Sequence, residues 1–260
     1  MRKIKLLLEY DGTRYAGWQS QKRPGVRTIQ EELEDKLKRL LKSEDVPLIC
    51  AGRTDAGVHA LGQVAAFRAG AGFSLPPDVA KKALNSMLPE DIRVMEASDC
   101  PPDFHPRHDA VKKTYFYLMA LMPSAPVFMR RYSWGLPWRL DIEAMKEAAA
   151  LIVGKRDFSA FRASGCGAKT PVKDILSIET ARLDEIGFLT AGFTGEFLKI
   201  SLTADAFLRH MCRNIVGTLV QVGRGKVTPD GVGRIIESGD RRLAGPTAPA
   251  CGLFLERVFY

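Results

Sequence analysis

The chain has 260 residues, enough to bury a substantial core in one large domain or in two smaller ones. Apolar residues make up 46% of it and charges of both signs are interspersed, which indicates a folded globular protein rather than a disordered one. The 38 Lys and Arg residues exceed the 30 Asp and Glu residues, so the net charge of +8 favours a polyanionic partner without identifying it.

Cysteine usage and hydropathy predict where the protein works. The five cysteines form no C-x-x-C pair, a pattern that fits a reducing cytoplasm better than a disulfide framework or a zinc site. No segment approaches the ~20 apolar residues of a membrane span. Glu9 and Asp11 interrupt the N-terminal apolar run too early for a signal peptide. We therefore expect a cytoplasmic protein with no membrane partner.

The first part of the chain alternates strand and helix patterns. Thr28 and Glu31 have the spacing of a capping box, and Ile29, Leu33 and Leu37 recur behind them at helical spacing. A second helix is expected over residues 76–87, with proline in its first turn. Strands are expected at residues 3–10, 46–51, 63–68 and 92–97. The predicted order is βαββαβ.

A proline-rich break at residues 100–106 separates this half from a second one with much the same series. Strand patterns cover residues 111–121, 174–183, 253–259 and a hairpin region at 188–203, and helix patterns cover 141–153, 207–222 and 229–237. We predict an α+β fold with two domains, 1–106 and 107–260. Each is an RRM-like or ferredoxin-like split βαβ unit, and their sheets join in a mixed, mainly antiparallel sheet with a central cleft suited to a nucleic acid loop.

The loop that follows the predicted strand at residues 46–51 is the strongest candidate for chemistry. Its sequence, GRTDAGVHA over residues 52–60, holds Asp55 between cations and glycines. Glycines let the backbone come close to a ligand, and Arg53 and His59 can stabilise an ionised Asp55. Such an aspartate can act as a nucleophile or a base. An ordinary turn is the alternative, because Gly, Asp and Thr are turn formers.

Further segments along the chain extend this pattern: residues 10–13 (YDGT), 15–19 (YAGWQ), 28–31 (TIQE), 112–117 (KKTYFY), 157–162 (DFSAFR), 207–217 (FLRHMCRNIVG) and 248–253 (APACGL). With the Asp55 loop they resemble the bacterial tRNA pseudouridine synthase A family, in its order and over essentially the whole chain. The resemblance implies the pseudouridine synthase fold, a homodimer and Asp55 as the catalytic residue. It also implies tRNA as substrate, with uridines at positions 38 to 40 of the anticodon stem-loop as targets.

The same resemblance assigns roles to four further residues. It implies that Arg213 is the cation that pairs with Asp55, and that Tyr115 stacks on the target uracil. It implies that Arg53 fills the gap left by a flipped nucleotide, and that Leu253 packs on the base. On pattern alone, a solvated arginine and core packing for Tyr115 and Leu253 are the simpler interpretations. Tyr117 shares a strand face with Tyr115 and is expected in the core.

Basic residues in or near loops and motif segments are candidates for RNA backbone contacts. They are Arg14, Arg23, Arg27, Lys112, Lys113, Arg162, Lys169, Arg209, Arg224 and Lys226. His59 is expected to be a structural partner of its own loop, and His210 stays open between structure and function. The sequence holds no nucleotide-cofactor motif and no metal-ligand constellation, so we expect no cofactor and no metal.

Two alternatives remain open at this point. A non-catalytic RNA-binding protein with two RRM-like halves would bind RNA without changing a nucleotide. An aspartate-dependent hydrolase would act on another substrate. Arg53, Asp55, Tyr115 and Arg213 together speak against the first, because a pure binder has no use for a carboxylate that repels phosphate.

Overall fold

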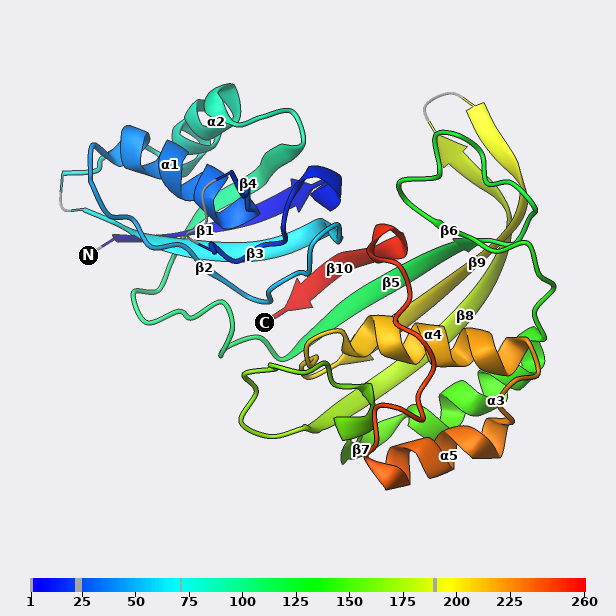
Figure 1. Ribbon diagram of the computed structural model, residues 1–260. Coiled ribbons are helices and arrows are strands. Elements are labelled where there is room, and N and C mark those ends of the chain that lie inside the picture. Colours follow the sequence, from blue (N-terminus) through cyan, green and yellow to red (C-terminus); the bar gives the residue numbers. More distant parts are fainter. Residues whose placement is uncertain (1, 22–24, 71, 189–190) are drawn as a thin grey trace. The chain divides into compact units, whose positions relative to one another are not determined.

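A computed structural model describes residues 2–21, 25–70, 72–188 and 191–260 (Figure 1). The chain forms two compact units. Unit 1 comprises Met1–Val111 and Phe254–Tyr260, and unit 2 comprises Lys112–Leu253. The domain division at residue 106 stays a prediction; the compact units divide at residue 111, and the end of the chain adds a strand to unit 1. No helix in the described ranges combines the length and apolar character that a membrane crossing requires.

Unit 1 is a sheet covered by two helices that lie side by side on one of its faces (Figure 1). Strand β1 (Arg2–Tyr10) pairs antiparallel with both β3 (His59–Ala69) and β4 (Ile92–Cys100). The short β2 (Ile49–Cys50) pairs antiparallel with β3, and β10 (Leu253–Phe259) pairs parallel with it. The helices are α1 (Ile29–Leu41) and α2 (Pro77–Met87), and the 3-10 turn η1 spans Gly12–Arg14.

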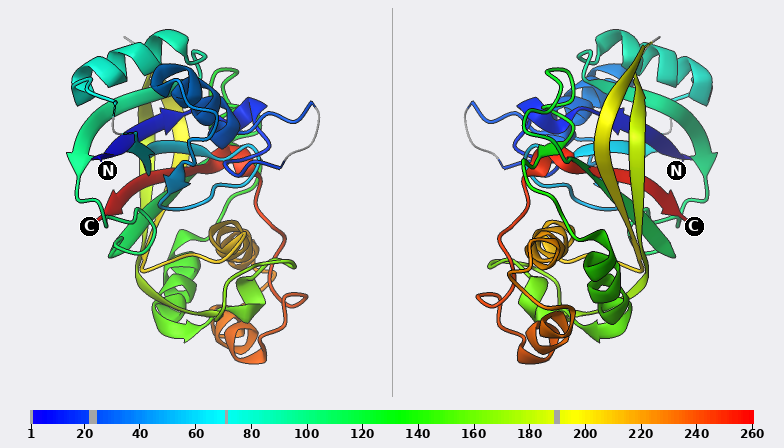
Figure 2. Two further views of the ribbon diagram at one scale, coloured as in Figure 1. Left: turned by 90° about the vertical axis from the view of Figure 1, so that its left-hand side faces the viewer. Right: turned by 90° about the vertical axis from the view of Figure 1, so that its right-hand side faces the viewer.

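Unit 2 is built on a long hairpin of β8 (Val172–Phe188) and β9 (Ala191–Ala204), which twists along its length (Figure 2). β5 (Lys112–Ala120) and β7 (Gly154–Asp157) pair antiparallel with β9 and β8, and β6 (Trp134–Gly135) pairs parallel with β5. Helices α3 (Ile142–Ile152), α4 (Met211–Gly223) and α5 (Pro229–Ser238) gather on one face of this sheet (Figures 1 and 2). Two 3-10 turns, η2 (Ser159–Phe161) and η3 (Ala250–Gly252), complete the unit.

The predicted α+β class, the mainly antiparallel pairing and the βαββαβ order of the first half are confirmed. Local chemistry explains the helix starts, because Thr28, Asp141 and Thr228 each accept a backbone N–H as the N-cap of α1, α3 and α5. The apolar side chains of Ile4 and Leu6 alternate along β1 and are fully buried.

Several boundaries differ from the prediction, and β3 and β8 are longer than the strands expected at 63–68 and 174–183. The strand expected at 46–51 shrinks to Ile49–Cys50, because Pro47 has no N–H to give a ladder. The helix expected from residue 207 begins at Met211, because His210 lies in the left-handed region with φ of 62°. Strands β6 and β7 were not predicted, since two and four residues carry too little alternation to stand out.

Candidate active site

Asp55 lies in the loop between β2 and β3, in unit 1, and is half-buried. The backbone is fixed on both sides of it. Trp18 N donates to the carbonyl oxygen of Thr54 at 3.0 Å, and Val58 N donates to the carbonyl oxygen of Asp55 at 3.1 Å. The loop around the carboxylate is therefore an ordered element rather than a free turn.

Two glycines of the N-terminal motifs pack directly on this loop. A Cβ atom at Gly12 would overlap the carbonyl oxygen of Val58. Gly17 has φ of +98°, and a Cβ atom there would lie 2.7 Å from the carbonyl oxygen of Thr54 and 3.0 Å from the carbonyl carbon of Asp55. Both positions need glycine, because only a residue without Cβ allows so close an approach. The N-terminal motifs thus serve to shape the aspartate loop.

A buried cluster of polar side chains packs against the Asp55 loop and supports it. The hydroxyls of Tyr10 and Thr54 lie 2.8 Å apart in a hydrogen bond. Gln63 donates from Nε2 to the Gly52 carbonyl at 2.6 Å and to the Tyr10 hydroxyl at 3.4 Å. Burial raises the pKa of Tyr10 well above its ordinary value, so the phenol keeps its proton and remains a neutral bridge.

His59 anchors the η1 turn, in line with the structural role expected of it. It is buried at the start of β3, where Gly12 N donates to its Nδ1 at 3.1 Å and its ring stacks on Phe254 at 4.7 Å. Asp11 Oδ1 also lies 3.1 Å from Nδ1. The two contacts are alternatives: Nδ1 accepts from Gly12 when it carries no hydrogen, and it donates to Asp11 when it carries one.

Arg53 is exposed and its side chain forms no hydrogen bond or ion pair within the described part of the chain. The expected support of the Asp55 charge by Arg53 is therefore not present as an ion pair in this structure. Its guanidinium is available to a ligand.

In unit 2, the two tyrosines of β5 have different surroundings. Tyr117 is fully buried and donates its hydroxyl proton to the Pro249 carbonyl at 2.8 Å, which confirms it as a core residue. Burial raises its pKa, with the positive charge of Arg213 opposing the rise. Tyr115 is buried at 6% exposure and meets the Phe207 ring edge-on at 5.1 Å.

Arg213 lies in the first turn of α4 and is half-buried. Its Nε donates to the Ala248 carbonyl at 2.7 Å, and Ala248 N donates to the Arg213 carbonyl at 3.1 Å. The segment over residues 244–249 therefore runs along α4. A Cβ atom at Gly245 would lie 2.7 Å from Thr218 Cα, so glycine is required for this close packing. Beyond it, η3 leads to Leu253, which is 5% exposed.

A polar network that the sequence did not reveal holds this arrangement in place. The fully buried Asn214 donates from Nδ2 to the Phe161 carbonyl at 2.8 Å. Its Oδ1 accepts from Arg241 Nη2 at 3.0 Å and from Thr247 Oγ1 at 2.6 Å. Asn214 thus links the DFSAFR segment and the 244–249 segment to the helix turn that carries Arg213. Its place beside Arg213 in the FLRHMCRNIVG segment was the available signal.

The candidate RNA-contact residues differ in accessibility. Arg14, Lys169, Arg209 and Lys226 are exposed, Lys112 and Arg162 are half-buried, and Lys113 is only 6% exposed. Arg27 is paired with Glu32 at 2.9 Å, and Arg224 stacks on Trp138 at 3.9 Å. Arg23 lies outside the described residues.

Among the proposed site residues, Asp55 and Arg53 belong to unit 1, and Tyr115, Arg213 and Leu253 to unit 2. The pairing of Asp55 with Arg213 stays a prediction.

Comparison with known proteins decides the family. The model of a tRNA pseudouridine synthase family matches residues 7–109 and 148–260. Three proteins named tRNA pseudouridine synthase A are similar over their full length and over all of this chain. They come from Thermodesulfovibrio yellowstonii (41% identical), Acetivibrio thermocellus (44%) and Geotalea uraniireducens (45%). The chain belongs to the tRNA pseudouridine synthase family.

Asp55 and Arg213 both lie in stretches of the chain that the family model matches. Tyr10, Gly12, Gly17 and Asp55 fall within the first stretch matched by the tRNA pseudouridine synthase family, and Arg213 and Leu253 fall within the second. Tyr115 lies between the two stretches. Within the described ranges of this synthase, no group of three or more His, Cys, Asp or Glu side chains is placed to hold a metal ion.

Proposed function

We propose that Asp55 is the catalytic residue with which this tRNA pseudouridine synthase isomerises uridines at positions 38 to 40 of the anticodon stem-loop. The observation that supports the assignment most is the construction of the loop. Two glycines, a buried Tyr10–Thr54–Gln63 cluster and backbone bonds on both sides all serve to fix Asp55. A carboxylate held this way is suited to a reaction that depends on positioning.

The reaction breaks the bond from uracil N1 to C1′ of the ribose and forms a bond from C5 to C1′. The base turns over in between, C5 gives up its proton and N1 takes one up, so the product is an isomer of the substrate. Asp55 acts as nucleophile toward the nucleotide or as base toward a sugar proton. Because the step is redox neutral and transfers no external group, the chemistry is compatible with amino-acid side chains alone.

The carboxylate needs a cation to stay ionised near an apolar base. Arg213 is proposed for this role. Its Nε is engaged with Ala248 and its helix turn is held by the Asn214 network, so the guanidinium is oriented in advance. An oriented guanidinium loses less freedom when it binds a carboxylate.

Substrate capture requires the target uridine to leave its stack, at a cost of a few kcal/mol. Arg53 is proposed to occupy the vacated place, because it is exposed and makes no hydrogen bond or ion pair in the described ranges. Tyr115 and Leu253 are proposed to pack on the flipped base. Lys112, Lys113, Arg14, Arg162, Lys169 and Arg209 are proposed RNA backbone contacts. A homodimer working in the cytoplasm completes the proposal.

The substitution Asp55→Asn tests the catalytic assignment, because it keeps the shape of the side chain and removes its charge. The variant is expected to bind unmodified tRNA like the original protein and to form no pseudouridine, as detected by carbodiimide derivatisation. Asp78→Asn, at an exposed acidic residue in the first turn of α2, is the matched control and should keep full activity. Turnover by Asp55→Asn close to that of the control would reject the assignment.

The same assay separates the alternatives. Pseudouridine has the mass of uridine, so isomerisation leaves the mass of the RNA unchanged while the carbodiimide signal appears. A binding module would give no signal with any tRNA, and a hydrolase would change the mass of its substrate.

A further inference from the structure

Unit 2 contains a basic hollow at the N-terminal end of α4. Its volume is about 760 Å³, and it lies between the loop at residues 162–166, the residues that precede α4, and the segment 239–242. Four arginines contribute to its lining: Arg162, Arg209, Arg241 and Arg242. We propose that this hollow, here called the arginine hollow, binds phosphates of the tRNA backbone and positions the tRNA relative to Arg213. The inference rests on the proposed tRNA substrate.

The charge balance of the arginine hollow favours an anion. Arg162 is half-buried and its side chain forms no hydrogen bond or ion pair within the described ranges. Asp240 stands next to the hollow, but Arg242 holds it in a bidentate pair at 2.7 to 3.0 Å. That pairing keeps the pKa of Asp240 at about 2, so the two charges cancel. Arg162, Arg209 and Arg241 are left as the net positive charge.

The rim of the hollow is ordered before any ligand arrives. Arg209 donates from Nη1 to the Ser164 carbonyl at 3.3 Å, and Ala163 N donates to the Arg209 carbonyl at 3.0 Å. Gly165, with φ of +70°, lets the loop approach the Arg209 guanidinium. A guanidinium held in place in this way, as that of Arg209 is, binds phosphate with less loss of freedom.

Arg241 contributes charge rather than hydrogen bonds. Its two Nη atoms donate to Ala244, Gly245, Asn214 and Thr247, so these donors are engaged within the protein. Burial lowers its pKa, because the positive charge is partly desolvated. A phosphate nearby would compensate for that lost solvation. The positive end of the α4 dipole acts in the same direction.

The walls of the arginine hollow indicate backbone phosphate rather than a free nucleotide. Apart from the imidazole of His210, the lining has no aromatic ring in the described part of the chain. Pockets that capture a free base are usually lined by apolar and aromatic side chains. Contacts made only to phosphates carry no sequence information, so the hollow should act alike on every tRNA substrate.

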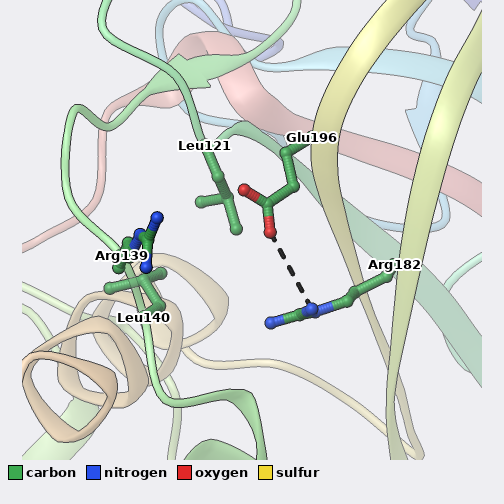
Figure 3. A pocket seen from close by; sticks show the side chains of 5 residues that line it. All are labelled: Leu121, Arg139, Leu140, Arg182 and Glu196. Atoms are coloured by element: carbon green, nitrogen blue, oxygen red, sulfur yellow. Dashed lines mark ion pairs between the residues drawn. The ribbon is translucent and has the colours of Figure 1, made fainter.

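A smaller hollow in the same unit makes a useful contrast (Figure 3). It has a volume of about 290 Å³ and is lined by Leu121, Arg139, Leu140, Arg182 and Glu196. Here the Glu196 carboxylate points toward Arg182 across the space, with N and O atoms 3.8 Å apart. The acid within its lining makes this hollow a poorer phosphate site.

Its position gives the arginine hollow a function in the proposed reaction. Arg209 and His210 directly precede α4, and Arg213 lies in the first turn of the same helix. A phosphate seated against Arg162 and Arg209 therefore fixes the tRNA backbone at the end of the helix that carries the proposed partner of Asp55. The site would position the substrate and take no part in bond making.

The test compares the salt dependence of tRNA binding for a double variant and a control. Replacing Arg162 and Arg209 by Gln should lower the slope of log Kd against log salt concentration by about 2, one for each lost phosphate contact. KM should rise by on the order of tenfold per arginine, a larger effect than that on kcat. Arg234→Gln, at an exposed arginine on α5 outside the hollow, should change neither quantity.

A second double variant, in which Arg162 and Arg209 are replaced by Lys, tests the role of charge because it keeps both positive charges. The salt slope should then stay near that of the original protein. The inference is overturned by an unchanged slope in the Gln variant, by an equal change in Arg234→Gln, or by losses confined to particular tRNA sequences. Saturable binding of inorganic phosphate that tRNA does not displace would also overturn it. Pseudouridine formation by the original protein is measured in parallel, so a failure of the proposed function is recognised separately.

Discussion

The backbone of Gly17 packs directly on the carbonyl oxygen of Thr54, the residue that precedes Asp55. A Cβ atom at Gly17 would lie 2.7 Å from that oxygen, and the φ of +98° is one that other residues rarely adopt. The N-terminal YAGWQ segment and the aspartate loop are therefore one structural element, although more than 30 residues separate them along the chain. Trp18 N, which donates to the same oxygen at 3.0 Å, belongs to this element too.

Gly17→Ala should move the aspartate loop and abolish most of the activity. The strained φ alone costs about 1–3 kcal/mol of folding free energy, and a displacement of about 1 Å at a catalytic group lowers the rate about 100-fold. Pseudouridine formation and urea unfolding measure the two effects. Gly70→Ala is the control, because its Cβ atom would meet nothing within 4 Å. Equal activity in both variants would show that the close approach does not position Asp55.

Asn214→Ala should lower both stability and activity. The substitution removes the side-chain oxygen that accepts from Arg241 and Thr247 and the side-chain nitrogen that donates to the Phe161 carbonyl. The Asn214 side chain is buried, and each buried polar group left without a partner costs about 1–3 kcal/mol of folding free energy. We also expect kcat to fall, because the network holds the turn of α4 that carries Arg213.

The control for this variant is Asn85→Ala, which removes two side-chain hydrogen bonds to the backbone of Val94 in unit 1. Urea unfolding should show a loss of stability for Asn85→Ala as well, but kcat should be retained. If the two variants lose kcat alike, the effect reflects general destabilisation rather than the orientation of Arg213.

Much of the fold could be predicted because local signals were strong. Thr28, Asp141 and Thr228 stand at helix starts as N-caps, and apolar spacing marks the faces of α1 and of β1. The start of α4 could not be predicted, because the apolar pattern continues through Phe207 and Leu208. Only the left-handed backbone of His210, a tertiary result, separates them from the helix.

The candidate site was predictable where chemistry lies in consecutive residues and not where it depends on distant partners. The Asp55 loop is visible as one run of nine residues. The links from Gly12 and Gly17 to that loop, and from Asn214 to Phe161 and Arg241, join segments between 27 and 53 residues apart. Such contacts are set by the strand pairing and by helix packing, which local periodicity does not specify.

The buried phenol of Tyr10 should make stability depend on alkaline pH. Burial raises its folded-state pKa, so the stabilising effect is complete below the ordinary value of about 10 and is lost as pH rises toward the folded pKa. The unfolded chain releases the proton first, which lowers the unfolding free energy by about 1.4 kcal/mol per pH unit above pH ~10. Tyr10→Phe should lower stability at neutral pH through the lost bond to Thr54 and reduce this slope. Denaturant unfolding from pH 8 to 12 checks the difference, and parallel curves would contradict it.

Arg53→Ala should separate nucleotide flipping from chemistry. The side chain is exposed and forms no hydrogen bond or ion pair in the described ranges, so its removal should change the unfolding free energy by no more than about 0.5 kcal/mol. A flipped uridine leaves a gap in a paired stem, whereas an unpaired loop has little stacking to lose. The variant should therefore lose more activity on a stem uridine than on a loop uridine, measured on two hairpins that differ only in the pairing of the target. Arg68→Ala, at another exposed arginine of unit 1, should treat both hairpins alike. An equal loss on both hairpins for Arg53→Ala would assign it to general RNA binding, since the neutralisation of phosphates does not depend on whether the target is paired.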